Sequence, residues 1–268
     1  MSNRPSQIIF LPGAGGRAPD LSAFRAGDED SLRFKVIGYP GWRRYVEECF
    51  SVDALVDEVV TQIAANIPNG PIRIVGSSIG GHFGYAAAVR LQSMGREIAG
   101  FCALDAFMIA SARATAGWKG RAIQQGVDLL SSRRFIEFAR FLRSKFWRSL
   151  LRLSGSRLSG LARRFGPFER LSLISDPVFE EELSMRLLIQ EAARWVVSLD
   201  REPIPLRAPA ILLRTREAAS SDAAWLRRCP AIKIWDIPGR HETLFDPDNI
   251  GLIADIFIAA THDWRSDI

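Results

Sequence analysis

The segment PIRIVGSSIGGHFGYAAA, at residues 71–88, runs from a short apolar stretch through two adjacent serines into a series of alanines, with glycines on both sides of the serines. The β-branched residues within 72–75 favour a strand, whereas the alanines at 86–88 favour a helix. Glycine accepts the crowded backbone of a sharp turn. The segment therefore predicts a strand that turns directly into a helix at Ser77 and Ser78.

Five further apolar runs resemble the strand expected at 71–77. None of the six alternates regularly between apolar and polar residues, which is typical of parallel strands covered on both faces. Helical patterns lie at 51–66, 79–94 and 247–260. The order of strands and helices predicts an α/β fold with a mostly parallel, doubly wound sheet. The six expected strands lie at 7–12, 33–39, 71–77, 98–105, 208–215 and 231–237.

One long segment, at 106–200, interrupts this order because it contains no convincing strand. An insertion of that length between two strands predicts a helical lid, carried by a core that consists of 1–105 and 201–268. The centre of the insertion, at 133–153, has the period of an amphipathic helix. Its apolar face would hold Phe135, Phe138, Leu142, Phe146, Leu150 and Leu153, with Arg133, Arg140, Arg148 and Arg152 largely on the opposite face.

Positive charge is concentrated in the same insertion. Residues 113–170 contain 14 Lys and Arg against 3 Asp and Glu, a net charge of +11 in a chain whose total is +5. Solvated helix surface is the ordinary interpretation of such charge. The alternatives are steering of an acidic protein or a phosphate group towards the site, and peripheral attachment to anionic lipid, which we do not expect. We expect no nucleic acid, because the sequence contains no recognised binding motif.

Composition places the chain among soluble proteins. With 268 residues, 47% of them hydrophobic, it can bury a sizeable core. No window approaches the roughly 18 apolar residues that a membrane span needs, and the N-terminal apolar run is too short for a signal sequence. The three cysteines are widely spaced, without a CxxC pair, which argues against disulfides and zinc sites. We therefore expect a cytoplasmic protein.

The residues Gly76-Ser77-Ser78-Ile79-Gly80 match the pattern G-x-S-x-G between an expected strand and an expected helix. In that context the pattern is typical of a nucleophile elbow, a strained turn that exposes a serine hydroxyl above a sheet. The alternative is a plain glycine-rich turn. We interpret Ser78 as a nucleophile.

A serine hydroxyl needs a general base, for which the chain has three histidines. His82 lies within the helix after the elbow, where packing is its expected role. His262 lies in the polar C-terminal tail, where we expect solvent exposure. His241 follows the last expected strand, so a loop at the carboxyl edge of the sheet would present it near Ser78. We therefore predict His241 as the base.

A carboxylate must hold the histidine in the correct tautomer. Two candidates lie at the ends of expected strands: Asp105 closes the run at 98–105, and Asp222 follows the run at 208–215. The order of strands in the chain does not decide between them.

Four segments resemble the thioesterase domains of nonribosomal peptide and polyketide synthases, which have the α/β-hydrolase fold. They are IIFLPGAGG at 8–16, VGSSIGGHFGYAAAVRL at 75–91, IAGFCALDAF at 98–107 and IPGRHETLFDP at 237–247. Together they span most of the chain outside the expected lid. The resemblance implies an α/β-hydrolase core with a helical lid and an enzyme of secondary metabolite biosynthesis.

The same resemblance assigns roles. Release-type thioesterases carry their acid after the elbow helix, which favours Asp105, whereas editing thioesterases favour Asp222. The glycine-rich loop and the elbow would supply oxyanion-hole donors from the amides of Ala14 and Ile79. Ser78, His241 and Asp105 would then cleave thioesters on a phosphopantetheine carrier protein or on coenzyme A.

No metal or organic cofactor is implied. Because the chain begins with methionine and shows no fused carrier domain, we expect a stand-alone enzyme. The alternatives are a carboxylesterase or lipase that acts on oxygen esters, and a catalytically silent hydrolase fold that serves as a binding protein.

Overall fold

A computed structural model describes residues 6–16, 18–24, 32–41, 44, 48, 51–107, 127, 130–131, 135–153 and 177–265. The chain divides into two compact units. The first consists of Met1–Tyr39, Val52–Ala110 and Ala192–Ile268, and the second of Pro40–Ser51 and Ser111–Glu191. The predicted division into a core and a lid at 106–200 stays a prediction.

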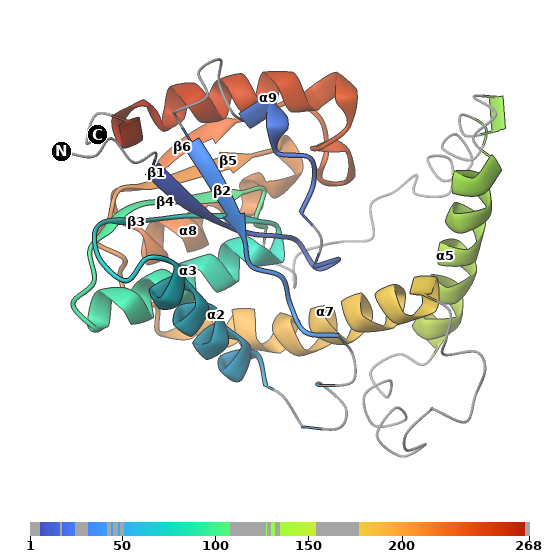
Figure 1. The fold of residues 1–268 in the computed structure, drawn as a ribbon, viewed down its shortest axis with the longest axis horizontal. Helices are drawn as coiled ribbons and strands as arrows, with labels where there is room; N and C mark the ends of the chain where they lie inside the picture. The colour runs from blue at the N-terminus through green and yellow to red at the C-terminus, as the bar shows by residue number, and fades with distance from the viewer. Residues whose placement is uncertain are drawn as a thin grey trace. The chain divides into compact units, whose positions relative to one another are not determined.

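The first unit is built on a six-stranded sheet in the order β2-β1-β3-β4-β5-β6 (Figure 1). Every neighbouring pair of strands is parallel. The chain starts at β1, adds β2 on one side and then the remaining strands on the other, so the sheet is doubly wound, as predicted. The strands are β1 (Ser6–Leu11), β2 (Leu32–Val36), β3 (Ile72–Ser77), β4 (Ile98–Leu104), β5 (Ala210–Arg214) and β6 (Lys233–Asp236).

Helices cover both faces of this sheet. Figure 1 shows α9 (Pro247–Ala260) on one side, and α2 (Val52–Asn66) and α3 (Ile79–Ser93) on the other. Because both faces are covered, β3 is buried along its whole length, which explains its lack of alternation. The unit also contains the end of α7 (Pro177–Arg201) from Ala192 onward. Its shorter helical elements include α8 (Asp222–Arg228), η1 (Ser22–Phe24), η6 (Arg216–Ser221), η7 (His241–Thr243) and η8 (His262–Arg265).

Aromatic side chains fill the space between the sheet and α9. Phe257 of α9 is 1% exposed, and its ring centroid lies 5.4 Å from that of Phe24 and 6.2 Å from that of Trp264. Trp264 in turn lies on β4 at Gly100, where an added Cβ would be 2.3 Å from the indole. Burial of such rings contributes about 1.5–3 kcal/mol each. This cluster anchors the sheet whose strand ends carry the site.

The second unit contains α5 (Phe135–Leu153) and the part of α7 (Pro177–Arg201) up to Glu191. Glu182 of α7 accepts hydrogen bonds from Arg148 at 2.7 and 3.0 Å and from Ser144 at 2.5 Å.

The sequence pattern predicts that the arginines of α5 lie largely opposite its apolar face. Arg140 and Arg148 form ion pairs with Glu181 and Glu182 of α7, and the Arg140 side chain is 55% exposed. Five large apolar side chains of the helix are exposed: Phe135, Ile136, Leu142, Phe146 and Leu150. Arg133 lies outside the described residues.

No helix within the described ranges is both long and apolar enough to cross a membrane. Cys102 and Cys229 are buried free thiols, and Cys49 lies outside the described residues.

The contact between Gly100 and Trp264 gives a stability prediction. Gly100→Ala forces the buried indole to move, and overpacking of this kind costs about 1–3 kcal/mol. Gly251→Ala is the matched control, because its Cβ meets nothing within 4 Å on α9 and alanine favours a helix by about 1 kcal/mol. Urea denaturation should therefore show opposite shifts in the free energy of unfolding. Equal shifts for the two variants would contradict the packing described for Trp264.

Candidate active site

Ser78 occupies a strained turn between β3 and α3. Its φ is 55° and its ψ is −125°, a conformation that non-glycine residues rarely adopt. Two hydrogen bonds hold the turn: the Ser78 amide donates to the Leu104 carbonyl at 2.8 Å, and the Gly81 amide donates to the Ser78 carbonyl at 3.0 Å. The elbow predicted from the sequence is therefore present, and Ser78 lies at its apex.

Glycines on both sides of Ser78 are required by the close approach of backbone segments. A Cβ at Gly76 would lie 2.2 Å from the carbonyl oxygen of Gly80, and one at Gly80 would lie 2.3 Å from that of Leu11. The atoms at those distances belong to the backbone, so they cannot move aside as the end of a flexible side chain could. Gly76 thus allows the turn to close on its own backbone, and Gly80 allows it to pack against the end of β1.

His241 lies at the start of η7, between β6 and α9. Its Nε2 is 3.0 Å from the Ser78 hydroxyl oxygen, and its Nδ1 is 2.7 Å from Oδ2 of Asp105. A carboxylate only accepts hydrogen bonds, so Nδ1 carries the proton and Nε2 is left to accept from the serine. The structure therefore brings Ser78, His241 and Asp105 into one hydrogen-bonded chain.

Asp105 follows β4 in a left-handed conformation, with a φ of 48°, and is fully buried. Its amide donates to the Leu213 carbonyl at 2.7 Å. Its Oδ1 accepts from both the amide and the hydroxyl of Thr215, at 2.7 and 2.9 Å. With Oδ2 facing His241, both oxygens of this buried carboxylate are hydrogen-bonded, as a buried charge requires.

Sequence reasoning missed Thr215. It is the first residue after β5, and its position beside Asp105 depends on β5 lying next to β4 in the sheet.

Asp222, the rival acid, begins α8 and forms an ion pair with Nε of Arg214 at 2.7 Å. Arg214 also donates to Asp236 at 2.6 Å. Asp222 is thus paired with the guanidinium of Arg214, whereas Asp105 is hydrogen-bonded to the imidazole of His241.

The glycine-rich loop after β1 lies beside the serine. The Gly16 amide closes a turn onto the Gly13 carbonyl at 2.9 Å. A Cβ at Gly13 would be 4.0 Å from the Ser78 hydroxyl oxygen. Ala14 lies within this turn, and Ile79 is the first residue of α3, where amides have no partner within the helix. Ala14 and Ile79, the residues predicted to supply oxyanion donors, therefore lie on two backbone segments next to Ser78, and their role stays a prediction.

The other two histidines lie apart from this chain. His262 is exposed, as predicted. His82 is fully buried within α3, where its Nε2 lies 3.1 Å from the Phe107 carbonyl oxygen and its Nδ1 lies 2.7 Å from the Arg228 guanidinium. Burial, and secondarily the charge of Arg228, lower the pKa of His82 to about 3.

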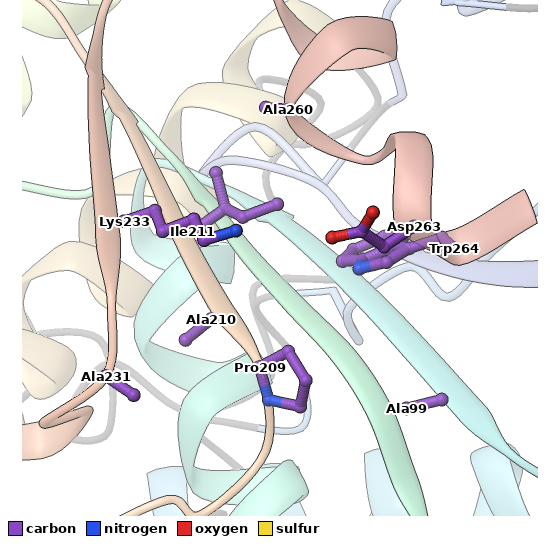
Figure 2. Close-up of a pocket in the computed structure, with 9 residues that line it drawn as sticks. All are labelled: Ala99, Pro209, Ala210, Ile211, Ala231, Lys233, Ala260, Asp263 and Trp264. Atoms are coloured by element: carbon purple, nitrogen blue, oxygen red, sulfur yellow. The ribbon is translucent and has the colours of Figure 1, made fainter. Parts of the chain in front are cut away.

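A pocket of about 320 Å³ (Figure 2) opens near the N-terminal ends of the strands, whereas the candidate active site lies at their C-terminal ends. Its lining includes Ala99, Ala210 and Lys233, which lie at the starts of β4, β5 and β6. Ser78, Asp105 and His241 all follow strand ends instead. This pocket is therefore separate from the candidate active site.

Among the described residues, no group of three His, Cys, Asp or Glu side chains is arranged to hold a metal ion.

The lowered pKa of His82 predicts how stability changes with pH. Between pH 6.5 and about 3 the unfolded chain binds a proton on this residue and the folded chain does not, so the free energy of unfolding falls as the pH falls. The slope is about 1.4 kcal/mol for each pH unit. Relative to a His82→Gln variant, the wild type should lose about 2 kcal/mol between pH 7 and pH 5 in urea titrations. Parallel pH curves for the two proteins would refute this.

The family model for the thioesterase domain matches residues 6–153. A comparison with curated protein sequences found no match.

Several solved structures share the fold. The thioesterase domain of NocB, in covalent complex with a fluorophosphonate nocardicin G analog, is 18% identical with a TM-score of 0.59, covering 95% of this chain and 94% of that one. The Vlm2 thioesterase domain bound with a dodecadepsipeptide is 18% identical with a TM-score of 0.58, covering 94% and 93%. The RedJ thioesterase of Streptomyces coelicolor is 15% identical with a TM-score of 0.58, covering 96% and 93%.

The parallel sheet and its helices are thus those of an α/β-hydrolase fold. The chain belongs to the thioesterase domain family and is a serine hydrolase that acts on thioesters.

Proposed function

We propose that Ser78, His241 and Asp105 form the catalytic triad of this thioesterase. The observation that carries the proposal is the unbroken chain from the serine hydroxyl through the imidazole to a buried carboxylate, with distances of 3.0 and 2.7 Å. The elbow supports the proposal because its strained backbone holds the serine beside the loop after β1.

In the first half of the reaction, Ser78 Oγ bonds to the thioester carbonyl carbon while its proton moves to Nε2 of His241. Asp105 stabilises the imidazolium and keeps its orientation. The carbonyl oxygen becomes an oxyanion, for which we assign the amides of Ala14 and Ile79 as hydrogen-bond donors. The carbon–sulfur bond then breaks, and the thiol leaves with the proton from His241.

In the second half, water or a nucleophile within the acyl chain attacks the acyl-serine ester. His241 takes the proton of the attacking group and returns it to Ser78 Oγ as the ester bond breaks. The acyl group leaves as an acid or as a cyclic product, and the enzyme regains its starting state.

We assign the substrate as an acyl or peptidyl thioester on the phosphopantetheine of a carrier protein, or on coenzyme A. Membership of the thioesterase domain family supports this assignment, as does the fold shared with domains that bind a dodecadepsipeptide or a nocardicin G analog. The basic segment at 113–170 would attract an acidic carrier or a phosphate. We assign the segment at 106–200 as a lid, and its α5 has exposed apolar side chains.

Removal of the nucleophile or the base tests the proposal. Ser78→Ala and His241→Ala should each lower kcat for a short acyl thioester by about 10⁴-fold or more, with the melting transition retained. The substrate panel should place acyl groups on coenzyme A, on a carrier protein and on N-acetylcysteamine, beside matched oxygen esters. Substantial turnover by Ser78→Ala would contradict the assignment, and faster cleavage of the oxygen esters would favour an esterase.

The acid is tested by a matched pair of substitutions. Asp105→Asn should lower kcat by about 10³- to 10⁴-fold, because an amide supports the wrong imidazole tautomer. Asp222→Asn, which weakens the pair with Arg214, should leave kcat within a few-fold of the wild type. The reverse result would transfer the role of the acid to Asp222.

Thr215 provides a finer test. Thr215→Val removes the hydroxyl donor to Asp105 but keeps the amide donor, so kcat should fall roughly tenfold. Thr215→Ser restores the hydroxyl and should restore most of the rate. If both variants matched the wild type in steady-state kinetics, Thr215 would have no part in holding the carboxylate.

A further inference from the structure

A second chain of buried polar groups lies close to the first. Asp200 of α7 pairs with Arg228 of α8 at 2.8 Å, and Arg228 contacts Nδ1 of His82 at 2.7 Å. Nε2 of His82 contacts the carbonyl oxygen of Phe107 at 3.1 Å. Arg228 and His82 are both fully buried. All four residues belong to the first unit, so their relative positions are described within one compact body.

The partners of His82 determine its protonation. A guanidinium only donates hydrogen bonds, so Nδ1 must accept from Arg228. A backbone carbonyl only accepts, so Nε2 must carry the proton and donate to Phe107. His82 is therefore neutral and acts as an oriented connector between a buried cation and the backbone that follows β4.

That backbone segment is held at two successive carbonyls. Trp225 Nε1 donates to the Ala106 carbonyl at 2.7 Å, beside the bond from His82 to the Phe107 carbonyl. The segment begins at Asp105, whose backbone is left-handed. The ring of Phe107 packs against the imidazole of His241, with centroids 4.5 Å apart and planes at 86°. Both ends of the Asp105–Phe107 segment thus contact His241.

The side chains of His82, Trp225 and Arg228 also contact one another through their aromatic rings and the guanidinium. The rings of His82 and Trp225 are stacked, with centroids 5.4 Å apart. The Arg228 guanidinium lies 5.1 Å from the Trp225 ring and 5.2 Å from the Tyr85 ring. A buried cation of this kind is rarely more stabilising than well-packed apolar residues of similar volume. Fold stability alone is therefore a weak reason for its presence.

We propose that His82, Arg228 and Trp225 are positioning residues, which fix the Asp105–Phe107 segment so that its carboxylate and its aromatic ring hold His241 in line with Ser78. This inference rests on the proposed triad. It gives His82 a role beyond packing in the core, and it explains why the buried cation Arg228 is present.

The test compares three variants with a short acyl N-acetylcysteamine thioester. His82→Leu removes both hydrogen bonds, and should lower kcat by about 10- to 100-fold with KM within twofold, since small misplacements of a catalytic group have effects of this size. His82→Gln keeps one acceptor and one donor on a similar reach, and should stay within about threefold of the wild-type kcat. Trp225→Phe keeps an aromatic ring but loses the donor to Ala106, and should share the kcat loss of His82→Leu.

A control separates positioning from stability. Phe257→Leu lowers stability in the layer between the sheet and α9, away from the segment in question. At a temperature where all variants are folded by circular dichroism, it should leave kcat unchanged. Recovery of the rate by His82→Gln is a second readout that a purely structural role would not produce.

The outcomes are distinguishable. If His82→Leu does not fold, Trp225→Phe decides, because it perturbs the same segment through a different donor. Wild-type kcat in folded His82→Leu or in Trp225→Phe would overturn the inference, as would an equal loss in His82→Gln and His82→Leu. Ser78→Ala, measured in parallel, reports on the triad itself: its inactivity beside normal His82 and Trp225 variants would reject only the positioning role.

Discussion

The site depends on one buried carboxylate that has a hydrogen-bonding partner for each oxygen. Asp105 is fully buried, and in an apolar interior an ionised carboxylate is costly unless it is surrounded by donors. Thr215 provides two donors to one oxygen, and His241 provides the third to the other. Because Thr215 follows β5 and His241 follows β6, the order of strands in the sheet is what brings these donors together. The parallel sheet thus brings side chains from distant parts of the chain together at the C-terminal ends of its strands.

Two residues at that edge of the sheet, Ser78 and Asp105, have a strained backbone for a similar reason. Ser78 and Asp105 are the only non-glycine residues with positive φ in the described part of the chain, and each directly follows the end of a central strand. Strain of this kind persists where the surroundings over-determine the backbone. At Ser78 those surroundings are Gly76, packed against the backbone of Gly80, and Gly80, packed against the end of β1. At Asp105 they are the hydrogen bonds to Ala106 and Phe107. The first arrangement exposes a hydroxyl, and the second aims a carboxylate at an imidazole.

The sequence predicted the features that depend on neighbouring residues. Six apolar runs became the six strands, and the glycines around Ser78 indicated the elbow, because these signals lie within a few residues of each other. The choice of Asp105 over Asp222 came from family resemblance. Thr215 and Arg228 could not be predicted, since their partners lie 110 and 146 residues away in the chain and only the sheet order brings them into contact. The helix at 135–153 was predicted, but the ion pairs of its arginines with α7 were not, because helical period shows which residues share a face and not what that face contacts.

The central claim is that the Ser78 hydroxyl is activated by the imidazole of His241. Fluorophosphonate labelling followed by peptide mass mapping tests it most directly, because the reagent bonds only to an activated hydroxyl and the map identifies the modified residue. The account predicts one adduct, on Ser78, formed rapidly in the wild type and formed at least about 10³-fold more slowly in His241→Ala. An adduct on another residue, or equally fast labelling of Ser78 without His241, would contradict it.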